Sequence, residues 1–184
     1  MLILVLGVAL WWAAHLFKRF APAARASMGD SGRAAVTGGL VLSVLLMIWG
    51  YRAAPMGELW WGSSPATKGI NNLLILIGFY LFAASGMKTA VAQRLRHPQL
   101  IGFSLWAFGH LLVNGDMPSL VLFGGLLVWA VVEMVVINRA QPRWSAPAGP
   151  VVPRKEVMAI VGTLVVYGAA SLIHIWLGYN PFGA

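Results

Sequence analysis

Six long stretches without a charged side chain restrict what this sequence can fold into. A helix needs roughly 20 apolar residues to cross the hydrocarbon core of a bilayer, and most of these stretches approach that length. The fourth and fifth are short, so their helices would have to tilt or thin the bilayer locally. The pattern predicts an all-α fold, a polytopic membrane bundle of about six transmembrane helices. The stretches cover about residues 1–17, 34–51, 69–87, 99–115, 117–132 and 157–179.

Composition agrees with a membrane protein. Apolar residues make up 59% of the chain and charged residues 10%, with a mean hydropathy of +0.78, well above soluble domains. The apolar stretches occupy most of the 184 residues, so we expect residues 1–184 to form a single integral membrane domain. Cysteine is absent, which excludes disulfides, thiolate catalysis and iron–sulfur ligation.

Basic residues are concentrated in alternate connections between the apolar stretches. Because cytoplasmic loops carry the excess of Lys and Arg, this alternation predicts both termini on the outer side, periplasmic if the membrane is a bacterial inner membrane. The remaining connections hold only Arg52 and Lys68 as basic residues. The connections expected in the cytoplasm hold three groups of basic residues: Lys18, Arg19, Arg25 and Arg33; Lys88, Arg94 and Arg96; and Arg139, Arg143, Arg154 and Lys155.

The charge pattern also excludes two other interpretations. Lys18 and Arg19 follow the first apolar stretch instead of preceding it, which favours a retained first helix over a signal peptide. The net charge of +8 comes from short loops without a nucleic-acid-binding motif, so membrane orientation and contact with anionic lipid explain it. We therefore expect membrane lipid, and no nucleic acid, among the partners.

Three histidines, His15, His110 and His174, lie within apolar stretches. An imidazole inside a bilayer needs a protein partner, a proton path or a metal, so these are the main candidates for a functional site. His110 belongs to a run at four-residue spacing that begins at Gly102, and such residues stack along one face of a helix. We therefore expect Trp106 and Asn114, from the same run, to line the site of His110.

Other polar and small side chains also repeat at helical spacing, as in a bundle that turns them toward a common interior. Most of the Ser, Thr and Asn residues are typical of interhelical packing. Glu133, near the inner end of its stretch, is expected to snorkel or to pair with a basic residue on that side. The repeats are Asn71, Gly78 and Ser85; Gly125, Trp129 and Glu133; and Thr163, Tyr167, Ser171 and His174.

Imidazoles without cysteine, and with few intramembrane carboxylates, fit haem b better than a closed zinc site. Haem b needs one or two imidazoles and a flat apolar slot with small and aromatic walls. No C-x-x-C-H sequence occurs, which excludes covalent haem attachment. On depth along the helices alone, His110 could pair with His15 or with His174, and the estimate slightly favours His174. The residues by themselves leave this choice open.

Several short motifs carry a family resemblance: Arg96-His97-Pro98, Leu105-Trp106, His110-Leu111 and Asn114-Gly115-Asp116, together with His15 and His174. With them the chain resembles, over nearly its whole length, the NnrU family of small bacterial membrane proteins. A related branch in plants and cyanobacteria is 15-cis-ζ-carotene isomerase, a membrane haem b protein with two histidine ligands. The resemblance implies that His15 and His110 hold the haem iron, with His174 as a third candidate.

The resemblance also implies a range of functions. The NnrU name is linked to nitrite and nitric oxide reduction in denitrifying bacteria, so we expect a haem b protein with a redox or nitrogen-oxide-related role and nitric oxide as a ligand. The alternatives are haem-dependent cis–trans isomerisation of a carotenoid or other polyene, and membrane electron transfer. The isomerase has a cysteine, used in ligand exchange, where this chain has Ala107. The sequence leaves open whether the protein is an enzyme, and its oligomeric state.

Overall fold

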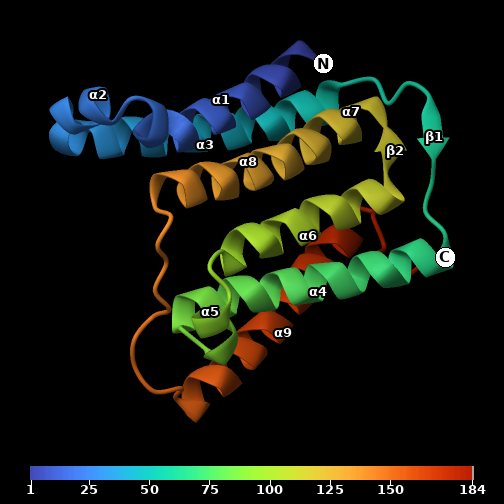
Figure 1. Ribbon diagram of the computed structural model, residues 1–184. Helices are drawn as coiled ribbons and strands as arrows, with labels where there is room; N and C mark the ends of the chain where they lie inside the picture. The colour runs from blue at the N-terminus through green and yellow to red at the C-terminus, as the bar shows by residue number, and fades with distance from the viewer. Residues whose placement is uncertain (184) are drawn as a thin grey trace.

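The structure is a computed structural model that describes residues 1–183, and it is a bundle of apolar helices (Figure 1). Five helical segments are long and apolar enough to cross a membrane, and a sixth, Pro98–Val113 (α6), is apolar but has only 16 residues. The expected polytopic membrane bundle is therefore confirmed, and so is the short fourth segment. The fifth segment, also predicted to be short, is instead long enough to cross, with 24 residues. The long segments are Leu2–Phe20 (α1), Gly29–Ala53 (α3), Pro65–Met87 (α4), Met117–Ala140 and Pro153–Trp176 (α9).

The segment Met117–Ala140 is composite. It begins with the short helix Met117–Ser119 (α7), continues as a π-helical turn over Leu120–Gly124 (η1), and ends as the α-helix Gly125–Ala140 (α8). Two short helices outside the long segments, Pro22–Ser27 (α2) and Ala90–Arg94 (α5), lie in the connections. Proline is at the start of α2, where its missing N–H costs no helical hydrogen bond.

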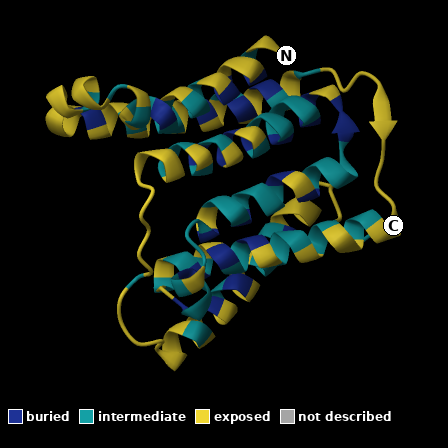
Figure 2. Cartoon of the chain, in the orientation of Figure 1, coloured by how far each residue is buried: buried dark blue, intermediate teal, exposed yellow. Residues whose placement is uncertain are grey.

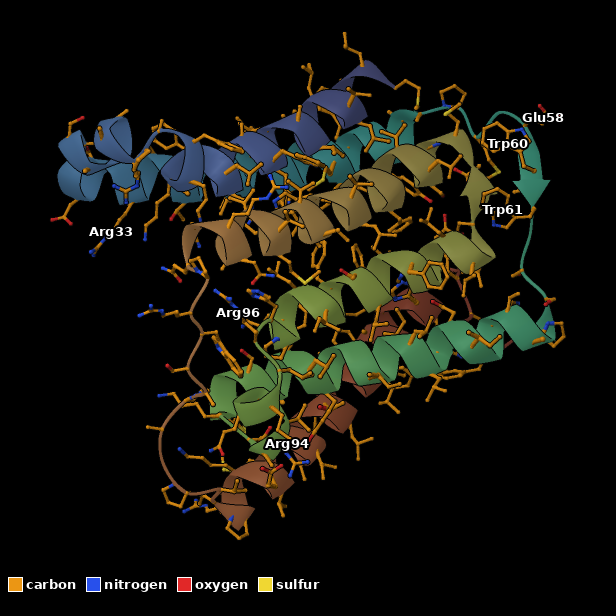
Figure 3. The ribbon with its side chains drawn as sticks, viewed as in Figure 1. Arg33, Glu58, Trp60, Trp61, Arg94 and Arg96 are labelled. Carbon is orange, nitrogen blue, oxygen red and sulfur yellow. The ribbon has the colours of Figure 1, made fainter. Side chains whose placement is uncertain are left out.

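The connections alternate between the two ends of the bundle, as a chain with six crossings requires. Both termini lie at one end with the strands Leu59–Trp61 (β1) and Gly115–Asp116 (β2), while α2, α5 and the connection after α8 lie at the other (Figure 1). Figure 3 shows Arg33, Arg94 and Arg96 at the end with α2 and α5, opposite Glu58, Trp60 and Trp61. The basic connections predicted to share one side of the membrane therefore lie together.

We expect the end that carries α2 and α5 to be cytoplasmic, because its basic residues should stay on that side during insertion. Reporter fusions at the C-terminus and within residues 140–155 should then report opposite sides of the membrane, with the C-terminal reporter outside. Reporters on the same side would contradict the topology. The opposite-side pattern with the two sides exchanged would contradict only the orientation.

Close contact between α4 and α6 depends on two glycines. A Cβ atom on Gly102 would lie 2.6 Å from the carbonyl oxygen of Gly78, so the two backbones meet without intervening side chains. Nearer the end with β1 and β2, a Cβ on Gly109 would lie 2.6 Å from Oδ1 of Asn71. Small residues allow this approach in membrane helices, where packing replaces the hydrophobic driving force. The repeat that includes Asn71 and Gly78 thus faces α6.

Helix α6 is central to the arrangement. It packs against α4 on one side and against α8 and η1 on the other, while α1 pairs with α3 and α9 packs on α4. Figure 2 shows exposed residues along the outward faces of α1, α3, α4 and α9 and mainly buried or half-buried ones along α6. An apolar cluster of buried residues connects α1, α3 and α8: Leu4, Val8, Met47 and Leu126.

A two-stranded antiparallel pair joins the connections before α4 and after α6, which the sequence predicts as a loop and a tight turn. Leu59 of β1 lies opposite Asp116 of β2, and Trp61 lies opposite Gly115. The indole Nε1 of Trp61 donates a hydrogen bond to the carbonyl of Leu111 at 2.8 Å. Strands of two and three residues are too short for an alternating pattern, so the sequence gives no signal for them.

Candidate intramembrane histidine sites

The three intramembrane imidazoles are held in the same way. Nδ1 of His15, His110 and His174 donates to the backbone carbonyl four residues earlier in its helix, at 3.0, 2.9 and 2.8 Å. A carbonyl oxygen can only accept, so Nδ1 carries the proton and Nε2 keeps its lone pair. This is the tautomer in which a histidine binds a metal through Nε2 while its other nitrogen is fixed by a hydrogen bond. Each of the three can therefore act as a neutral nitrogen ligand.

His110 lies in an aromatic setting on the face of α6 that meets η1. Its ring stacks on Phe123, with centroids 4.6 Å apart and planes inclined by 26°, and Trp106 is 5.1 Å away. Phe123 belongs to the π-helical turn, and such turns often occur at functional sites. On another side, the rings of His110 and His174 have their centroids 6.5 Å apart.

The residues of the four-residue repeat from Gly102 to Asn114 do not all face the same neighbouring element. Gly102 meets α4, whereas Trp106 and His110 meet Phe123. The four-residue step exceeds the helical repeat, so successive members drift around α6 by about 40° per step. Asn114 is the C-cap of the helix, where the backbone becomes extended, and its Nδ2 donates to the carbonyl of His110 at 2.8 Å. Trp106 thus borders the His110 ring, and Asn114 contacts its backbone.

His174 lies in the last turn of α9, where its side chain is exposed. The tail after α9 folds back onto α4 and fixes this end of the helix. Nδ2 of Asn72 donates to the carbonyl of Pro181 at 3.0 Å, and Nζ of Lys68 donates to that of Gly183 at 2.5 Å. Helix α4 thereby positions both α6, which carries His110, and α9, which carries His174.

His15 occupies a different environment, between α1 and α8. Its ring is 4.2 Å from that of Trp11 and 4.5 Å from that of Trp129. One turn beyond Trp129, the buried Glu133 pairs with Arg19, with 3.5 Å between Oε1 and Nε. The expected pairing of Glu133 with a basic residue at this end is confirmed. The repeat of Gly125, Trp129 and Glu133 faces α1 throughout.

Aromatic rings connect the two environments. From Trp11 beside His15, successive neighbours are Phe103 at 6.1 Å, Trp106 at 5.1 Å from Phe103, and His110 at 5.1 Å from Trp106. Within residues 1–183, the aromatic neighbours of His110 are Trp106, Phe123 and His174, and His15 is not among them.

Sequence reasoning did not select Phe103, Phe123 or Arg19. The two phenylalanines resemble lipid-facing ones in sequence, so no local signal marks them. Arg19 could have been found, because it follows His15 by four residues and therefore shares its helix face.

The histidine rings of residues 1–183 form one close pair, His110 and His174. Among the described residues, no group of three or more His, Cys, Asp or Glu side chains is placed to hold a metal ion. Neutral imidazoles beside aromatic and small residues fit haem b, which needs one or two axial nitrogens and gains the rest of its iron coordination from the porphyrin. The chemistry of the residues present is thus compatible with this cofactor.

Comparison with known proteins adds one finding. The family described as NnrU protein matches residues 3–181, nearly the whole chain. No curated protein and no solved structure matches it.

Proposed function

Because the chain belongs to the NnrU family, we propose that it is an integral membrane haem b protein with a redox or nitrogen-oxide-related role. The observation that carries the proposal is the shared state of the three intramembrane histidines. Each has a fixed Nδ1–H and a free Nε2 in apolar surroundings. His110 belongs to both ligand pairs that we consider, with His15 or with His174.

The residues around His110 orient its ring for binding a metal through Nε2. The hydrogen bond from Nδ1 to the carbonyl of Trp106 orients the ring and raises the basicity of Nε2. Stacking on Phe123 restricts rotation of the ring, and a neutral imidazole avoids burying a charge in the membrane. Bound haem b would supply one-electron redox chemistry and an iron that can bind nitric oxide.

The proposal is tested on the purified full-length protein from haem-replete cells. We expect a Soret band, with the haem identified as b-type by its pyridine haemochrome. Colourless protein that also fails to take up added haemin would contradict haem binding. Titration of the reduced protein with nitric oxide should change the spectrum, and an unchanged spectrum would exclude the nitrogen-oxide role.

Isomerisation of a polyene is the second candidate. It is favoured by the exposed position of His174 at the edge of the bundle, where an apolar substrate could approach from the lipid. Ala107 counts against isomerisation, because this fully buried residue lacks the thiol that the isomerase branch has at the same position. Reconstitution with 9,15,9′-tri-cis-ζ-carotene under reducing conditions separates the two candidates. Product formation that depends on His110 would favour the isomerase.

A further inference from the structure

We infer that His174, and not His15, is the second imidazole that holds haem iron together with His110. The inference rests on the haem proposed above and assigns its ligand pair differently from the family resemblance, which implies His15 and His110. Two observations carry it: the spacing of the His110 and His174 rings, and the position of His15, which is not among the aromatic neighbours of His110 within residues 1–183.

The spacing of His110 and His174 suits one metal ion between them. Metal–imidazole bonds of about 2.0 Å place the centres of two rings on opposite sides of an ion roughly 6 Å apart. The observed separation is 6.5 Å, and both rings have Nδ1 engaged and Nε2 free. The centroid separation of the pair is therefore close to that of two imidazoles on one ion.

His174 is exposed and His110 is half-buried, so the two imidazoles meet at the edge of the bundle. Helices α6 and α9 are both held by α4 and make few contacts with each other. A cofactor bound between the two rings would therefore interrupt few direct contacts between α6 and α9.

His15 lies apart from this pair, beside two tryptophans. Rings of Trp11 and Trp129 lie against it, and Trp129 is only 4% exposed. Haem at His15 would have to displace these side chains from a close-packed interior, where rearrangement is costly. His15 instead fits as a packing partner of Trp129 beside the Arg19–Glu133 pair.

Substitution of each histidine in the full-length protein tests the inference, with ferric haem spin state as the readout. His174→Ala should keep haem on His110 but change its optical and electron paramagnetic resonance spectra from low-spin to high-spin. Added imidazole should restore the low-spin spectrum by occupying the vacated position. The matched variant His15→Ala should stay low-spin. A low-spin His174→Ala beside a high-spin, imidazole-rescued His15→Ala would overturn the inference and favour the family pair.

A second variant gives a positive signature that a merely structural role would not produce. His174→Met should introduce a sulfur–iron charge-transfer band and raise the reduction potential, because methionine–histidine ligation favours ferrous haem. His15→Met should do neither. If the band arises in His15→Met and not in His174→Met, the inference is wrong. If the wild type binds no haem, the proposed function fails, a result distinct from either ligand outcome.

Discussion

Replacement of His110 by alanine is expected to abolish low-spin haem and to leave most purified molecules without the cofactor. His110 is shared by both proposed ligand pairs, and its ring is anchored by the Trp106 carbonyl and by Phe123. Loss of an outer-shell partner alone typically lowers metal affinity 10–100-fold, so loss of the ligand should cost more. The ratio of haem to protein, measured as pyridine haemochrome in detergent-purified wild type and variant, checks this result.

His97→Ala is the matched control. His97 lies at the opposite end of α6, and its Nε2 is 2.8 Å from Oδ1 of Asn138, so it is already engaged outside the apolar interior. This variant should retain wild-type haem content. His110→Ala with wild-type haem content and a low-spin spectrum would exclude His110 as a ligand and remove the central residue of the proposed function.

The membrane bundle was predictable because a bilayer imposes a length and a lack of charge on every crossing segment. All six apolar stretches correspond to helices. The largest error in a boundary is at Glu133, where the uncharged fifth stretch ends but the helix continues to Ala140. The carboxylate can remain in the helix because Arg19 pairs with it. That compensation depends on a contact between distant segments, which hydropathy does not reveal.

The candidate site was predictable only in part. Histidines in apolar stretches are conspicuous, and helix depth alone already gave His174 a slight advantage. The π-helical turn has no local signature, so neither its presence nor the position of Phe123 against His110 could be foreseen. Likewise, the approach of His110 to His174 follows from the packing of both helices on α4, which is tertiary information.

Asp116→Ala is expected to destabilise the protein by about 2–4 kcal/mol, because Asp116 both caps a helix and hydrogen-bonds a buried hydroxyl. Oδ1 of Asp116 accepts from the backbone N–H of Ser119, and Oδ2 accepts from its hydroxyl, both at 2.8 Å. Ser119 is fully buried, and its Oγ is also 2.9 Å from the hydroxyl of Tyr51 on α3. Unfolding in detergent, followed by circular dichroism, measures the loss.

Asp116→Ala should also disturb the surroundings of His110, through the π-helical turn η1 that follows α7. Asp116 fixes the start of α7, and α7 leads directly into η1, which carries Phe123 against His110. We therefore expect Asp116→Ala to weaken haem retention, whereas Asp116→Asn, which keeps an oxygen for the Ser119 N–H, should lose about half as much stability. Wild-type stability in Asp116→Ala would contradict the role of the carboxylate. Lower stability with unchanged haem retention would show instead that His110 keeps its position without support from the π-helical turn.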